Sequence, residues 1–212
     1  SDLDTPVSAY LKLCQNKNLK NTFLLESVQD GSYRGRYSVI GMYPDLIWKN
    51  IKNEVFINEL YRKNSFEKSS IEPLKSLKSI IENSKIDFPA FLPPMSTALF
   101  GYLGYEIIDQ YEKLPERKLN DLDLPDGFFI RPTIMAIFDS LKNKLIITSP
   151  LWYKKNLNFK KEYHNKIKLL EEIRSSLQNS IKYTNKKIKR NKILPKSNIS
   201  KKKFIEMVNV AK

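Results

Sequence analysis

The chain has 212 residues, a net charge of +14, 41% hydrophobic residues and a single cysteine. This size and composition allow a substantial core in one large or two small domains, and they exclude a disordered chain. Because no apolar run approaches the roughly 18 residues of a membrane-spanning helix, the N-terminus is polar and acidic, and one cysteine excludes an internal disulfide, we expect a cytoplasmic protein without membrane contact.

The positive charge alone does not indicate nucleic-acid binding. Lys supplies most of it, and Asn and Ile are in excess together with Lys, which an AT-rich coding sequence would produce on any solvated surface. Nucleic-acid surfaces favour Arg and interleaved aromatic side chains. We therefore expect no nucleic-acid partner, and a stand-alone basic binding module is only an alternative function.

The chain should begin with a helix. Thr5 is a suitable N-cap and Pro6 a suitable first helical residue. Apolar residues then recur at helical spacing to about Lys17. Cys14 lies on this apolar stripe, so it is predicted to be a buried, unreactive thiol.

The next forty residues have the alternation and turn residues of strands. Tyr43-Pro44 should break the chain between two of them, and Lys52-Asn53 should form the turn of a hairpin. The expected strands are 22–27, 36–41, 45–51 and 54–60.

Pro73 should open a helix that runs to about Ser84. Its predicted inner face is formed by Leu74, Leu77, Ile80 and Ile81. After a proline-rich connection, residues 97–103 are predicted to form a buried strand. Gly101 and Gly104 indicate a close approach of two backbones there.

The rest of the chain completes an α+β protein, with an antiparallel-rich sheet and flanking helices. Residues 128–139 and 144–150 should form a long hairpin, whose first strand is covered on both faces. The other expected elements are helical residues 105–114, a long amphipathic helix at 158–180, a linker rich in Lys and Asn at 183–197, and a helix from Ser200 onward.

Residues for common catalytic sites are missing. His164 is the only histidine and lies among charged residues of a predicted helix, and Cys14 has no second cysteine with which to bind zinc. The phosphate-binding motif is absent, and the pair Gly101 and Gly104 lacks the third glycine of a dinucleotide site. The sequence therefore predicts no catalytic centre and no metal site within these residues.

Four motifs connect the chain to a known family: FLLES at 23–27, RGRYSVIG at 34–41, LFGYLGYE at 99–106 and LPDGFFIRP at 124–132. With them, nearly the whole chain resembles the N-terminal region of anthranilate synthase component I, the large subunit. Aminodeoxychorismate synthase component I shares the weaker of these motifs and is the alternative. Where many relatives carry a glycine pair before the GY motif, this chain has Ser96-Thr97.

The resemblance implies a regulatory and scaffold domain at 1–182, a basic linker at 183–197 and the start of a truncated chorismate-binding catalytic domain at 198–212. The full-length enzyme would convert chorismate and ammonia to anthranilate and pyruvate. A glutamine amidotransferase subunit, component II, would deliver the ammonia, and Mg²⁺ would be bound by the C-terminal part. No catalytic residue is carried over to these positions, and we expect the fragment alone to be inactive.

The resemblance also implies a feedback site for L-tryptophan around the strand formed by Leu24, Leu25, Glu26 and Ser27. A free amino acid needs an acceptor for its ammonium and a donor for its carboxylate. Glu26 can supply the first, and Ser27 with nearby backbone N–H groups the second. Arg36, or less readily Arg34, could add a carboxylate contact. The alternative is that Glu26 and Ser27 are an ordinary edge-strand pair and Arg36 a surface cation.

Overall fold

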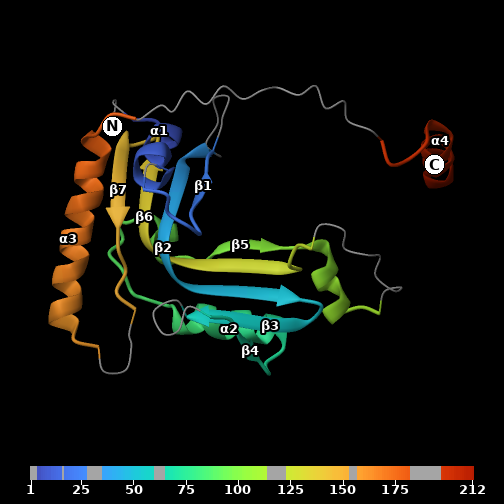
Figure 1. Cartoon of the computed structure of the whole chain (residues 1–212), viewed down its shortest axis with the longest axis horizontal. Coiled ribbons are helices and arrows are strands. Elements are labelled where there is room, and N and C mark those ends of the chain that lie inside the picture. Colours follow the sequence, from blue (N-terminus) through green and yellow to red (C-terminus); the bar gives the residue numbers. More distant parts are fainter. Residues whose placement is uncertain are drawn as a thin grey trace. The chain divides into compact units, whose positions relative to one another are not determined.

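The computed structural model describes residues 4–15, 17–27, 35–59, 65–113, 123–152, 157–181 and 197–212 (Figure 1). The chain divides between Ile181 and Lys182 into two compact units. The first unit is built on a seven-stranded antiparallel sheet with helices packed against it. The α+β class that the sequence predicts is confirmed.

Two long strands, β2 (Tyr37–Ile51) and β6 (Gly127–Asp139), pair with each other in the middle of the sheet. Each of these two strands also pairs with one further strand near each of its ends. β1 and β3 pair with β2, and β5 and β7 pair with β6. β4 adds a further edge next to β3. The outer strands are β1 (Phe23–Leu25), β3 (Glu54–Glu59), β4 (Glu67–Ser69), β5 (Phe100–Leu103) and β7 (Lys144–Thr148).

The chain break predicted at Tyr43-Pro44 is wrong, because β2 runs through these residues. Tyr43 has a positive φ of 52°, and the pairing with β6 shifts register between Pro44 and Leu46. Such a bulge bends a strand and also accommodates a proline that cannot donate to the ladder. Figure 1 shows β2 and β6 changing direction together, so the bulge converts the predicted break into a bend.

A buried ion pair lies at this bend. Arg131 on β6 donates from Nε and Nη2 to the two carboxylate oxygens of Asp45, at 2.8 and 3.0 Å. Its Nη1 donates to the hydroxyl of Ser84 at 2.8 Å, and its guanidinium lies 4.7 Å from the ring centre of Trp152. Arg131 and Asp45 are only 8% and 6% exposed. The pair therefore joins the bulge to the neighbouring strand in a site that excludes water.

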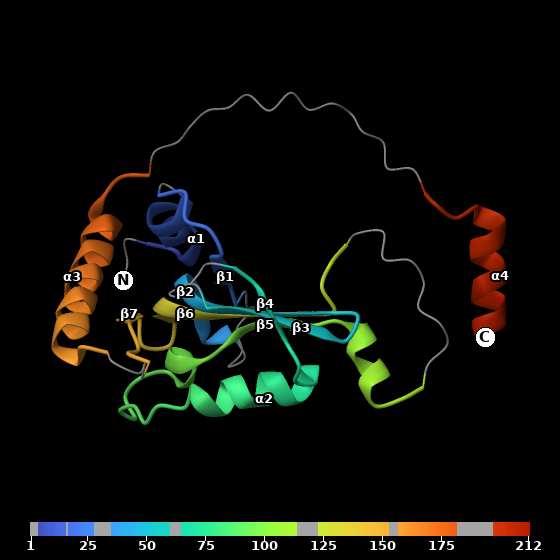
Figure 2. The ribbon, with the colours of Figure 1, turned by 60° about the horizontal axis from the view of Figure 1, so that its bottom comes forward.

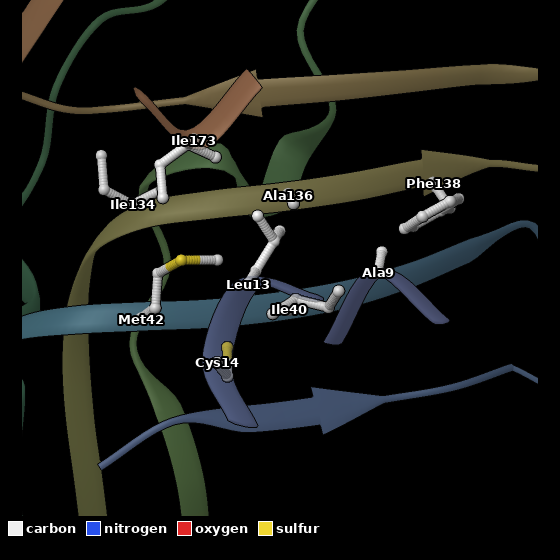
Figure 3. Close-up of a cluster of buried hydrophobic side chains, with 9 residues drawn as sticks. All are labelled: Ala9, Leu13, Cys14, Ile40, Met42, Ile134, Ala136, Phe138 and Ile173. Atoms are coloured by element: carbon white, nitrogen blue, oxygen red, sulfur yellow. The ribbon is translucent and has the colours of Figure 1, made fainter. Parts of the chain in front are cut away.

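Helical segments cover one face of the first half of β2 and the second half of β6. The helix predicted from Pro6 begins there, with Thr5 as its N-cap, but α1 (Pro6–Tyr10) continues as a π-helical segment, η1 (Leu11–Gln15), and not as an α-helix to Lys17. Figure 3 shows the apolar side chains that meet in this cluster. Its buried members are Ala9, Leu13, Cys14, Ile40, Met42, Ile134, Ala136, Phe138 and Ile173. Cys14 is buried, as predicted, and burial raises the pKa of its thiol to about 11, which lowers the share of reactive thiolate at neutral pH.

The long helix α3 (Phe159–Gln178) joins the same cluster through its C-terminal half; the predicted helix at 158–180 is confirmed, and it is one residue shorter at its start and two at its end. Lys12 donates from Nζ to the carbonyl of Leu177 at 2.8 Å, which satisfies a carbonyl at the helix end. In the N-terminal half of α3, Phe159 and Tyr163 are 50% and 55% exposed. Only part of the predicted apolar stripe therefore reaches the core.

A second helix, α2 (Pro73–Asn83), covers the sheet beyond the bend (Figure 2). Leu77 packs with Trp48 and Val55, and the Trp48 indole donates to the hydroxyl of Ser76 at 3.3 Å. The helix and its start at Pro73 agree with the prediction. Ile81, predicted to face inward, is 45% exposed.

The buried strand predicted at 97–103 is shorter and more exposed in the structure. A 3₁₀ turn, η3 (Pro94–Thr97), precedes β5, whose residues Tyr102 and Leu103 are each 43% exposed. β5 pairs only with β6 and lies at the edge of the sheet, which explains the exposure. The predicted helix at 105–114 is a 3₁₀ helix, η4 (Tyr105–Gln110), and residue 114 lies outside the described residues.

The described part of the second unit consists of residues 197–212. Its helix, α4 (Lys201–Ala211), begins one residue after the predicted start at Ser200, which is its N-cap; the Ser200 hydroxyl accepts from the Lys203 amide at 3.3 Å. Except for Ser197, the linker predicted at 183–197 lies outside the described residues. None of the helices within the described ranges is long and apolar enough to cross a membrane.

We expect Arg131→Met to cost about 3–5 kcal/mol of unfolding free energy, because it removes the guanidinium that binds both oxygens of the buried Asp45 carboxylate. Urea unfolding followed by circular dichroism measures this cost. Lys68→Met is the matched control, since the Lys68–Glu54 pair is exposed and such pairs contribute about 0–1 kcal/mol. Equal costs for the two substitutions would contradict the role given to the buried pair.

Candidate functional site

The first two motifs, FLLES and RGRYSVIG, lie side by side. β1 pairs antiparallel with the first half of β2, so that Phe23 is opposite Gly41 and Leu25 is opposite Val39. FLLES and RGRYSVIG, separated along the chain, therefore form one two-stranded unit at this side of the sheet. Residues 28–34 between them lie outside the described residues, and Arg34, an alternative carboxylate ligand, is among them.

The end of β1 presents the predicted site residues to solvent. Directly opposed residues of an antiparallel pair point to the same side of a sheet. Leu24 accordingly packs with Ile40 in the core cluster, whereas Leu25 points to the other side and is 54% exposed. Glu26 and Ser27 follow the strand and are exposed. An acid, a hydroxyl and an apolar side chain are thus available together.

The backbone of Ser27 is fixed by a buried hydroxyl. Its amide donates to Ser38 Oγ at 3.1 Å, and Ser38 is only 6% exposed. This bond continues the pairing of β1 with β2 beyond Leu25. It also means that the Ser27 N–H is already used, so the hydroxyl is the donor of Ser27 that is left to bind a carboxylate.

The Arg36 side chain is held in place by contacts with Asp139 and Tyr37. Its Nε and Nη2 donate to the two oxygens of Asp139 at 2.9 and 2.6 Å, and its guanidinium lies 4.7 Å from the Tyr37 ring centre. The Arg36 guanidinium holds the pKa of the buried Asp139 carboxyl below its usual range, and the Lys142 amide adds a second bond. A ligand carboxylate at Arg36 would have to compete with Asp139.

The backbone of Arg36 is held in place as well. Ser140 donates to the Arg36 carbonyl from its amide at 3.0 Å and from its hydroxyl at 2.8 Å. Hydrogen bonds therefore hold Ser27, directly before residues 28–34, and Arg36, two residues after them. Sequence reasoning missed Ser38, Asp139 and Ser140. The only signal in the sequence concerns Asp139 and Ser140, the polar residues that end the apolar stretch IMAIFDS at 134–140.

Two glycines allow the strands of this region to approach closely. A side chain at Gly41 would overlap the ring of Phe23, which packs at 4.5 Å between ring centres on Phe100 of β5. A side chain at Gly101 would overlap the backbone of Phe128 on β6. The close approach predicted at Gly101 is thus confirmed, and Gly41 has a similar role beneath the β1 strand.

The described residues also bear on metal binding. No group of three or more His, Cys, Asp or Glu side chains there could hold a metal ion. His164 is exposed on α3, with Nδ1 2.6 Å from the Lys160 carbonyl oxygen. The described part of the chain therefore does not fit Mg²⁺, and no chemical step through a metal is assigned to it.

Comparisons with known proteins agree with the motifs. No family model matches the chain. Anthranilate synthase component 1 of Cereibacter sphaeroides is 42% identical over 165 residues, covering 77% of this chain and 33% of the relative. The protein of the same name from Thermus thermophilus is 35% identical over 150 residues, and that from Acetivibrio thermocellus is 31% identical over 220 residues, covering the whole of this chain and 43% of the relative.

The fold has a counterpart among solved structures. The crystal structure of anthranilate synthase component I from Streptococcus pneumoniae matches the whole chain with a TM-score of 0.61 and 21% identity, over 43% of its own length. At this identity the likeness concerns the fold alone. The chain spans less than half the length of each of these proteins. The curated relatives, at up to 42% identity, show that this chain resembles the anthranilate synthase component 1 family over part of the length of those proteins.

Proposed function

We propose that this chain is the regulatory and scaffold part of an anthranilate synthase component I. The full-length protein then converts chorismate and ammonia to anthranilate, pyruvate and water. The supporting observation is the similarity to curated proteins of this name at up to 42% identity. Because the chain covers only 43% or less of these relatives, the activity belongs to the whole protein and not to these residues.

We also propose a domain organisation, a partner subunit and a metal for the full-length protein. Residues 1–182 form the regulatory domain, 183–197 a basic linker and 198–212 the start of the catalytic domain. A glutamine amidotransferase subunit supplies ammonia, and Mg²⁺ is bound by residues outside this chain. The enzyme works in the cytoplasm, which agrees with a single free cysteine.

The product distinguishes this enzyme from its closest alternative. Full-length protein supplied with chorismate, ammonia and Mg²⁺ should form anthranilate, identified by its fluorescence and by chromatography. The 212-residue chain under the same conditions should form none. Formation of aminodeoxychorismate, without release of pyruvate, would instead favour an aminodeoxychorismate synthase.

We place the tryptophan site at Leu25, Glu26 and Ser27. The observation that carries this proposal is that these three residues are exposed at the end of a strand whose backbone is fixed by Ser38. A rigid exposed segment can bind a small ligand without first losing its own conformational freedom.

Each group has a matching part of the inhibitor. The Glu26 carboxylate accepts from the tryptophan ammonium, a charge-assisted bond that is stronger than a neutral one. The Ser27 hydroxyl donates to the tryptophan carboxylate, and Leu25 contacts the indole. Arg36 contributes only if its Nη1 group reaches the carboxylate while Nε and Nη2 stay on Asp139.

Binding at this strand regulates by a shift between two conformations. Tryptophan binds more tightly to the state in which the catalytic part cannot close on chorismate, so it raises the chorismate concentration needed for activity. The coupling is reciprocal, and chorismate lowers tryptophan affinity by the same factor.

Substitution of the two polar residues tests the site. We expect Glu26→Ala and Ser27→Phe in the full-length enzyme to weaken tryptophan binding at least about tenfold, because a hydrogen bond to a charged group contributes about 1.5–3 kcal/mol. Calorimetry measures the affinity, and Glu82→Ala, an exposed acid on α2, is the control that should bind normally. Undiminished affinity in both site variants would refute the assignment.

Ser38 is predicted to act as a positioning residue. Ser38→Ala removes the acceptor for the Ser27 amide and should weaken tryptophan binding about fivefold, close to the 1 kcal/mol of one hydrogen bond. Ser38→Thr keeps a hydroxyl and should restore most of the affinity. Equal affinities for the Ala and Thr variants, with equal unfolding free energies, would show that the bond does not position Ser27.

A further inference from the structure

The N-terminal helical segments α1 and η1 contact the start of β1. The Tyr10 hydroxyl lies 3.0 Å from the hydroxyl of Thr22, the residue directly before this strand. Leu24, in the strand itself, packs against the core cluster that includes Leu13 and Cys14 of η1. Two views of the molecule show α1 between β1 and the C-terminal end of α3 (Figure 1, Figure 2). The strand that carries the proposed inhibitor site is therefore held on its core side by α1 and η1.

Lys12 joins η1 to the last turn of α3. Its Nζ group donates to the Leu177 carbonyl oxygen at 2.8 Å and lies 2.8 Å from Oδ1 of Asp4. Asp4 also accepts from the Ser8 hydroxyl at 2.7 Å, which fixes its carboxylate on α1. The Lys12 and Asp4 side chains are only 13% and 11% exposed, and partly buried pairs are screened less by salt than exposed ones. One ammonium group therefore binds both the residue before α1 and the end of α3.

The segment that carries Lys12 is wound as a π-helix. The apolar spacing of the sequence predicts an α-helix there, whereas Leu11–Gln15 is π-helical, and the Leu19 amide donates to the Cys14 carbonyl, five residues earlier, at 3.0 Å. Such segments are rare, are mostly single turns and are frequent at functional sites. Because a π turn contains more residues than an α turn, a change between the two windings would rotate Lys12 relative to Tyr10. The contacts with α3 and with Thr22 therefore depend on one winding of the helix.

We propose that α1 and η1 transmit the state of the tryptophan site from β1 to the end of α3, with Lys12 as the positioning residue at α3. This inference rests on the tryptophan site proposed above. Coupling between distant sites is carried by contiguous hydrogen bonds and packed elements that have two discrete arrangements, and the π and α windings of η1 are such a pair. α3 ends at Gln178, three residues before the first compact unit ends at Ile181. In the proposed organisation the chain continues from there to the catalytic part, so a change in the contact between Lys12 and Leu177 reaches the segment that leads to it.

Two tryptophan titrations of the full-length enzyme measure this coupling. Calorimetry with Mg²⁺ and without ammonia gives the tryptophan dissociation constant in the absence of chorismate and at saturating chorismate, and the ratio of the two constants is the coupling factor. Lys12→Met keeps an apolar side chain of similar length but removes the bonds to Asp4 and Leu177, and we expect it to lower the coupling factor at least about twofold. Lys78→Met, at an exposed lysine of α2, is the control and should leave the factor unchanged. A purely structural role of Lys12 would lower the unfolding free energy without changing this factor.

Tyr10→Phe tests the other end of the link. It removes the hydroxyl that contacts Thr22 and should also lower the coupling factor. Because both substitutions interrupt one link, the variant that carries both should lower the factor no further than the stronger single variant. A normal factor in Lys12→Met, or effects of the two substitutions that add in free energy, would overturn this inference alone. An unsubstituted enzyme that binds no tryptophan, or binds it equally with and without chorismate, would refute the proposed regulation and this inference with it.

Discussion

The ion pair between Asp45 and Arg131 is the constraint on which the arrangement of the sheet depends. Two buried charges are costly to remove from water, and only bidentate geometry with further hydrogen bonds offsets that cost. Here both carboxylate oxygens and the Ser84 hydroxyl accept from one guanidinium. Because Asp45 belongs to the bulge of β2, the pair holds the bend in one geometry.

The bend gives the two long strands two different sets of neighbours. Before it, β2 carries β1 and is covered by α1 and η1; beyond it, β2 carries β3 and is covered by α2. The contact of Phe23 with Phe100 joins β1 to β5 across this change of direction. The exposed end of β1 therefore lies on a support that is fixed from both halves of the sheet, as a small-ligand site requires.

Much of this fold could be predicted from local patterns: the N-cap Thr5, the hairpin turn at Lys52-Asn53 and the presence of α3 all follow from short-range chemistry. The bend could not be predicted, because Pro44 indicates a break unless the partner of Asp45, 86 residues away, is known. For the same reason β5 was expected to be buried, since its place in the strand order decides its exposure. At the candidate site, the motifs indicated Leu25, Glu26, Ser27 and Arg36, whereas Ser38 and Asp139 are recognisable only from strand pairing.

The central claim is that tryptophan binds at the end of β1. Amide NMR of the isotope-labelled full-length protein, titrated with L-tryptophan and separately with L-phenylalanine, tests it most directly. The account predicts shifts that saturate with tryptophan and are concentrated at residues 24–27 and 36–41, with much weaker effects from phenylalanine. Saturating tryptophan shifts that leave both segments unchanged would contradict it.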